Sequence, residues 1–145
     1  MKKIHLVVVG KIKEDFYRAA VAEYVKRISR FAKVEIRELA EGADLETEAA
    51  DILRAVKGYV IALAVEGEKA SSEKLAAKTK KLFDEGKELT FVIGSSCGLS
   101  ERVKSVADWK LSFSDMTFPH QLMRVILLEQ IYRAFMINGG GTYHK

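Results

Sequence analysis

Three nearly continuous apolar runs constrain the fold of this chain more than any other feature. They cover Ile4–Val9, Tyr59–Val65 and Leu89–Ile93, and glycine or polar residues follow each of them. Apolar runs without polar alternation are typical of strands that are buried on both faces. Such strands occur mostly in parallel sheets that helices cover on both sides. The runs therefore predict an α/β fold.

The stretches between these runs have helical spacing. Lys13–Arg30, for example, carries apolar residues three and four apart, with lysine and arginine on the opposite face. Val34–Leu39 instead alternates apolar and charged residues, which predicts a half-exposed strand near a sheet edge. We expect one α/β domain over residues 1–145, with a mostly parallel five-stranded sheet and helices on both faces. The remaining elements are expected as helices over Asp44–Lys57, Ser72–Glu85 (with Ser72 as N-cap), Ser100–Ala107 and Pro119–Ile137, and a short strand over Lys110–Ser114.

Length and composition agree with one domain in a reducing compartment. A chain of 145 residues, 48% of them hydrophobic, can bury a core of its own. The single cysteine, Cys97, excludes an intrachain disulfide. No apolar run approaches the roughly 20 residues that span a bilayer, and the run after Met1 is too short for a signal peptide. We therefore expect a cytoplasmic protein without a membrane segment. The net charge of +4 permits an anionic partner such as RNA.

Three loops are expected at the carboxyl edge of the sheet, where parallel sheets bind ligands. They are Glu66-Gly67, Gly94–Ser100 and Ser114–Pro119, and we expect them to form one site. No metal is expected there, because His5, His120 and His144 lack the spacing of metal ligands.

The loop Gly94–Ser100 admits two interpretations. It contains G-x-S-x-G, the nucleophile elbow of hydrolases, with Ser96 as the nucleophile. Asp115 and His120 follow in the hydrolase chain order. They are only five residues apart, however, whereas the acid and base of a hydrolase normally come from separate loops. A loop whose backbone N–H groups cradle a ligand is therefore favoured, with a small serine hydrolase as the alternative.

The carboxyl-terminal helix and the tail after it have unusual features. The helix is apolar almost all round, which favours packing against a second subunit over a core helix in a monomer. Arg124 lies near its first turn, where it is expected to contact an anionic ligand or an RNA phosphate. The glycines at 139–141 end the helix, and a flexible tail, Thr142–Lys145, is expected to follow. Its Tyr, His and Lys side chains suit stacking, proton transfer and phosphate contact, although a frayed terminus is the alternative.

Three sequence blocks together resemble a known family. They are F-V-I-G-S-S-C-G-L-S, then S-F-S-D-M-T-F-P-H-Q-L-M-R-V-I-L-L-E-Q-I-Y-R-A, and finally Y-H-K. The chain resembles, over its whole length, the bacterial ribosomal large subunit pseudouridine methyltransferase H family of the SPOUT superfamily. The resemblance implies a homodimer with a carboxyl-terminal trefoil knot. It also implies S-adenosylmethionine as cofactor and N3 of a pseudouridine in helix 69 of 23S rRNA, on the assembled ribosome, as the methyl acceptor.

The resemblance also assigns residues to the site. Backbone groups that hold the methyl donor are expected at Leu63, Gly94, Phe113, Ser114, Asp115, Met116, Thr117 and Phe118. The chain departs from the family at Ser95, where a second glycine is usual, and at Ala64, where an acid is common. Among the expected catalytic residues, His144 would be the general base and Tyr143 would orient the target base. Arg124 and Lys145 would contact the RNA. A ribosome-binding module without catalysis is a second alternative.

Overall fold

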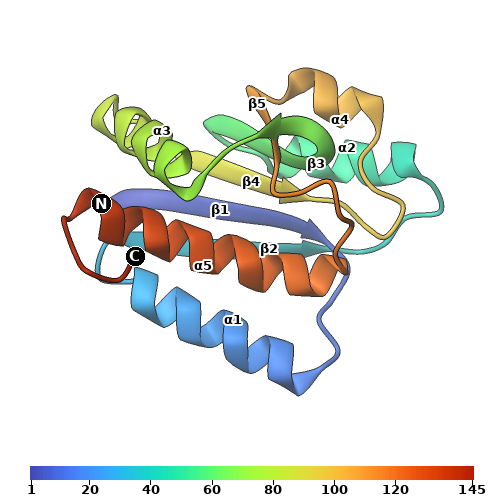
Figure 1. Ribbon diagram of the computed structural model, residues 1–145. Helices are drawn as coiled ribbons and strands as arrows, with labels where there is room; N and C mark the ends of the chain where they lie inside the picture. The colour runs from blue at the N-terminus through green and yellow to red at the C-terminus, as the bar shows by residue number, and fades with distance from the viewer.

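The computed structural model describes residues 1–145 as one α/β domain (Figure 1). Its sheet has five parallel strands in the order β2-β1-β4-β3-β5, so the expected parallel architecture is confirmed. The elements in chain order are β1 (Lys2–Val9), α1 (Asp15–Ile28), β2 (Ala32–Leu39), α2 (Leu45–Ala55), β3 (Tyr59–Lys69), α3 (Ser72–Asp84), β4 (Leu89–Ile93), α4 (Glu101–Val106), β5 (Trp109–Ser112) and α5 (His120–Asn138).

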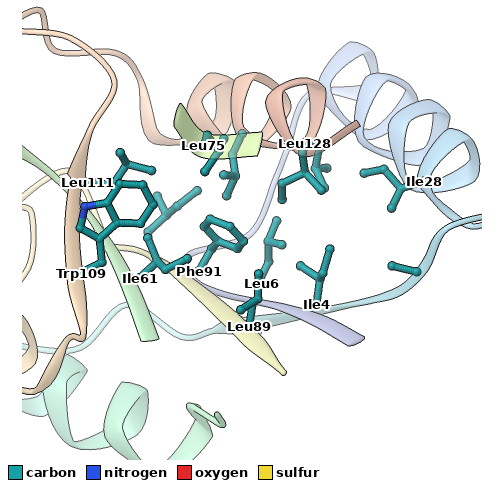
Figure 2. Packing of buried hydrophobic residues seen from close by; sticks show 14 of the residues in the cluster. Ile4, Leu6, Ile28, Ile61, Leu75, Leu89, Phe91, Trp109, Leu111 and Leu128 are labelled. Carbon is teal, nitrogen blue, oxygen red and sulfur yellow. The ribbon is translucent and has the colours of Figure 1, made fainter. Parts of the chain in front are cut away.

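Alternation along the strands divides the core into two layers. Leu6, Phe91 and their neighbours pack against α1, α3 and α5 on one face of the sheet, which Figure 2 shows from close by. Val7 and Val92 point to the other face and pack against α2 and α4. Successive side chains of a strand point to opposite faces, so each fully apolar run supplies both layers.

Strand β2 lies at an edge of the sheet, as its alternating pattern predicted. In β2, Ala32 is buried while Lys33, Glu35 and Ile36 are exposed. It pairs with β1 in register from Lys2 opposite Ala32 to Val9 opposite Leu39. An edge strand has only one neighbour and less cover, which leaves charged side chains in water.

The prediction of a loop at Glu66-Gly67 is wrong. Strand β3 continues to Lys69, with a register shift between Leu63 and Glu68 where it pairs with β5. A side chain at Gly67 would lie 2.7 Å from the backbone of Lys110, so the glycine permits this close approach. The apolar run in the sequence ends at Val65, before the strand does, because the second half of β3 is held by backbone pairing and not by side-chain burial.

Two further boundaries differ from the sequence expectation. The N-cap of α3 is Ser71, whose Oγ accepts a hydrogen bond from the Lys74 amide at 3.1 Å, and not Ser72. Strand β5 ends at Ser112, so the whole stretch from Phe113 to Pro119 is a connection between β5 and α5. None of the helices has both the length and the apolar character needed to cross a membrane.

Candidate active site

A cavity of about 530 Å³ lies at the carboxyl ends of β3, β4 and β5, beside the start of α5. In Figure 1 these strand ends lie at the opposite end of the molecule from both termini. The cavity contains residues of the loops Gly94–Ser100 and Ser114–Pro119, together with Glu66, which lies within β3. The residues expected at the methyl donor that line it are Leu63, Gly94, Phe113, Ser114, Met116, Thr117 and Phe118.

One residue of the expected donor set points elsewhere. The Asp115 side chain is 79% exposed and pairs with Lys69, with 2.6 Å between Oδ1 and Nζ. It does not line the cavity. The ion pair ties the connection between β5 and α5 to the end of β3.

The connection from Phe113 to Phe118 offers free backbone donors to the cavity. Its internal hydrogen bonds are few: Ser112 Oγ donates to the Ser114 carbonyl, and the Met116 amide donates to Ser114 Oγ, each at 3.0 Å. Among the connection residues that line the cavity, Thr117 and Phe118 have amide N–H groups that no protein acceptor takes. These two amides are available to a polar ligand.

The glycine loop forms the second wall of the cavity. The Gly98 amide donates to the Ser95 carbonyl at 2.8 Å, which closes a tight turn. Gly98 has φ +83°, a conformation that favours glycine. A side chain at Gly94 would fall on the Gly98 carbonyl oxygen, so Gly94 must be glycine for the turn to close.

A lysine–glutamate pair marks the rim near β3. Lys104 and Glu66 both line the cavity, and their side chains form an ion pair, with Glu101 at 3.6 Å from Nζ. The hydrogen bond from Lys104 holds the pKa of the Glu66 carboxyl below its usual range. The same bond raises the pKa of the Lys104 amine. The rim is therefore charged but internally neutralised.

His120 is a cavity residue that the methyltransferase assignment left out, although the hydrolase alternative named it. It begins α5, lines the cavity and makes no hydrogen bond within the chain. Burial, and then the charge of Arg124, lower the pKa of its imidazole, so the ring is neutral at neutral pH. The signal was present in the sequence, because Pro119 places the first turn of a helix at the carboxyl edge of the sheet.

Arg124 corrects the expectation of a phosphate contact. Only 1% of the residue is exposed, and its guanidinium donates to Glu38 Oε2 at 2.8 Å and to the Gly10 carbonyl at 2.7 Å. Burial lowers the pKa of the guanidinium, and the bond to Glu38 opposes that shift. The side chain turns inward because the carboxyl end of β1 offers it unpaired carbonyl oxygens. Arg124 thus joins α5 to β1 and β2.

The tail is folded against the chain and is not a flexible extension. Tyr143 donates its hydroxyl to Glu129 Oε2 at 2.7 Å and packs edge-on against Tyr132, with 4.9 Å between ring centroids. His144 Nδ1 lies 3.0 Å from Arg133 Nη1, and its other nitrogen contacts Glu73. Burial and the bond to Glu129 raise the pKa of Tyr143 to about 12.

The tail and the cavity occupy different parts of α5. The cavity reaches Met123, whereas the tail contacts Glu129 and Arg133. Ten residues of helix between Met123 and Arg133 span about 15 Å. The expected catalytic residues Tyr143 and His144 are therefore not brought into the cavity of their own chain.

The hydrolase arrangement is not assembled. Ser96 lies at the cavity but is exposed, and no hydrogen bond connects it with His120 or His120 with Asp115. Cys97 is exposed in the same turn. No group of three or more His, Cys, Asp or Glu side chains is arranged to hold a metal ion.

Comparison with known proteins first defines the class. A family model described as a predicted SPOUT methyltransferase matches residues 1–144. The TrmH/SpoU tRNA-modifying enzyme of A. aeolicus has a similar fold, with a TM-score of 0.51 and 15% identity over 96% of this chain and 78% of that one.

Closer relatives then define the family. The ribosomal RNA large subunit methyltransferase H of Bifidobacterium adolescentis is 47% identical over 158 aligned residues, 99% of this chain and 99% of that protein. The protein of the same name from Bifidobacterium animalis subsp. lactis is 50% identical over 98% of this chain and 99% of its own length. The chain belongs to the SPOUT methyltransferase family and, within it, to the ribosomal RNA large subunit methyltransferase H proteins.

Proposed function

We propose that this protein is an S-adenosylmethionine-dependent methyltransferase that modifies ribosomal RNA of the large subunit. The observation that carries the proposal is the cavity, which is lined by β3, the glycine loop and the connection from β5 to α5, and contains residues that the family resemblance assigns to the methyl donor. Relatives named for this activity match the chain over nearly its full length. The proposed acceptor is N3 of a pseudouridine in helix 69 of 23S rRNA on the assembled ribosome, which implies a cytoplasmic protein.

The residues present fit S-adenosylmethionine. Its adenine and ribose need apolar walls and backbone partners, which Leu63, Phe113 and Phe118 and the free amides of the connection supply. Gly94 keeps its part of the wall free of a side chain. When bound, the cofactor supplies a methyl group on a positively charged sulfur. No metal is required, because a sulfonium needs no further activation.

The protein must position the acceptor and remove one proton. The bound cofactor would supply the methyl group to the N3 imide nitrogen, and the electron pair of its carbon–sulfur bond would stay on the sulfur. The imide proton passes to a base of the protein. Alignment of the two reactants supplies the largest part of the rate enhancement, and a general base adds roughly 10²–10⁴-fold.

We assign the base to His144 and the orientation of the target base to Tyr143, with Lys145 on a phosphate. A phenol with a pKa of about 12 stays neutral at neutral pH, so Tyr143 serves as a hydrogen-bonding and stacking group. The position of the tail on α5 adds a condition, because one chain does not bring His144 to its own cavity. A second copy must supply the tail, or the tail must leave its contacts with Glu129 and Glu73.

A homodimer meets that condition best. Leu122, Val125 and Ile126 of α5 are only half buried in the single chain, which leaves apolar surface next to the cavity. Covering this surface with a second α5 would bury it and bring two tails near two cavities. The trefoil knot also belongs to this proposal. Its support is that the connection from Phe113 to Phe118 lines one cavity together with β3 and the glycine loop.

Calorimetric titration with S-adenosylmethionine is the direct test. We expect one binding event per chain in the micromolar range, followed by methyl transfer to ribosomes that carry the unmethylated pseudouridine. A protein that binds ribosomes but not the cofactor would be a non-catalytic module and would overturn the proposal. Labelling by a fluorophosphonate probe, lost in Ser96→Ala, would instead favour the serine hydrolase.

A further inference from the structure

Glu48 is an acidic residue buried in the core, and the mechanism above does not use it. It lies in the first turn of α2 and is 6% exposed, the one acid among the buried residues. No lysine, arginine or histidine lies within 4.0 Å of its carboxylate. Burying a carboxylate without a cation is costly unless hydrogen bonds replace its water.

Both oxygens of this carboxylate accept a hydrogen bond from a loop. The Gly42 amide donates to Oε2 at 3.1 Å, and the Ser95 hydroxyl donates to Oε1 at 3.0 Å. Hydrogen bonds to a charged acceptor are the stronger kind. Glu48 thereby links the connection between β2 and α2 to the glycine loop of the cavity.

Ser95 transmits this contact to the turn that walls the cavity. Its Oγ, while donating to Glu48, accepts from the Cys97 amide at 3.3 Å. Its carbonyl accepts from the Gly98 amide at 2.8 Å. One residue therefore fixes both ends of the turn Ser95–Gly98, and it is itself buried at the cavity.

We propose that Glu48 is a positioning residue for the cofactor site, acting through Ser95 to hold the turn Ser95–Gly98 in the conformation that binds the methyl donor. The identity of that donor rests on the proposed function. The hydroxyl of Ser95 gives the turn a fixed support that a glycine would lack.

Three variants and two matched controls test the proposal in the full-length protein. Ser95→Ala removes the hydroxyl that donates to Glu48, and Glu48→Gln removes the negative charge while keeping the shape of the side chain. The double variant completes a double-mutant cycle. Glu46→Gln is the matched control for Glu48, because it lies in the same turn of α2 with its side chain exposed. Ser29→Ala is the matched control for Ser95, because its hydroxyl bonds a carbonyl at the end of α1.

Titration with S-adenosylmethionine is the first measurement. We expect Ser95→Ala to raise the dissociation constant about fivefold to tenfold, within the range of one intramolecular hydrogen bond. Glu48→Gln should raise it by a similar factor, and the double variant by no more than the larger single effect, since both act through one contact. Both controls should bind as the parent does. Unchanged binding in folded Ser95→Ala and Glu48→Gln, or effects that multiply, would overturn the proposal.

Hydrogen exchange in the ligand-free protein is the second measurement and does not depend on the donor. The Gly98 amide should exchange about tenfold faster in Ser95→Ala and Glu48→Gln, while amides of the core strand β4 keep the parent rate. A uniform rise across the sheet would mean a merely structural role and would sink the idea. If the parent itself fails to bind S-adenosylmethionine, the proposed function is wrong, whereas this exchange result still decides the role of Glu48.

Discussion

The two ends of α5 differ in the kind of groups that surround them. At its start, the cavity is built from apolar side chains, free backbone amides and one neutral histidine, His120. Toward its end, the tail is held by charged and aromatic contacts with Glu129, Arg133 and Glu73. The first arrangement suits a bound small molecule, and the second suits a segment that can be released. Helix α5 therefore carries two parts of the proposed active site, about three turns apart.

Deletion of Thr142–Lys145 is the strongest test of this division. We expect methylation of ribosomes to fall more than 10³-fold, because the proposed base and orienting groups are removed together. The affinity for S-adenosylmethionine should stay within about twofold of the parent, because no tail residue lines the cavity. Single-turnover methylation and calorimetry measure the two quantities. A truncated protein that methylates at the parent rate would show that the tail end is not catalytic.

Gly94→Val should affect the opposite end of the helix. Its side chain would fall on the Gly98 carbonyl, so we expect affinity for S-adenosylmethionine to drop at least 100-fold. The ion pair between Glu129 and Arg133, and the tail contacts, should persist in this variant.

Mixing Gly94→Val subunits with tail-deleted subunits tests whether the cavity of one chain and the tail of another can form one active site in a dimer. Recovery of activity in the mixture indicates a shared site, and none indicates that each chain acts alone.

Arg124→Met tests the structural link beside the cavity. Removing the guanidinium leaves Glu38 and the Gly10 carbonyl without their donor, and we expect a loss of about 2–3 kcal/mol in the free energy of unfolding. The value is below that of a fully buried pair, because the Glu38 side chain is partly exposed. Urea unfolding measures it. If the variant keeps the parent stability and loses ribosome affinity, Arg124 contacts RNA after all.

The pH dependence of stability gives the smallest effect. Burial lowers the pKa of His120 in the folded protein, so the unfolded chain binds the proton more readily. Stability from this group is therefore complete above the unfolded pKa of about 6.5 and declines as the pH falls below it. We expect His120→Gln to lose less stability than the parent between pH 7.5 and 5.5. Equal losses in both proteins would mean that the environment of His120 does not disfavour its charged form.

Much of the site was predictable because it depends on chain order. Parallel strands place all their carboxyl ends at one edge, so the strands ending at Ile93 and Ser112 had to bring the loops that follow them together. The donor residues at 113, 114 and 116–118 followed from this edge and the resemblance, and they line the cavity. The sequence did not show that the Asp115 side chain points away from the cavity. The direction of a loop side chain depends on a distant partner, which here is Lys69.

The sequence by itself determined the α/β class, the edge position of β2 and the carboxyl-edge site, because these follow from local periodicity and strand direction. Only the tertiary structure decided that Arg124 faces inward, that Ser95 bonds Glu48, and that the tail lies along α5. Each of these contacts joins residues that lie 14 to 86 positions apart. Local pattern sets which face of an element is apolar, whereas the partner of a polar side chain is set by what the folded chain places beside it.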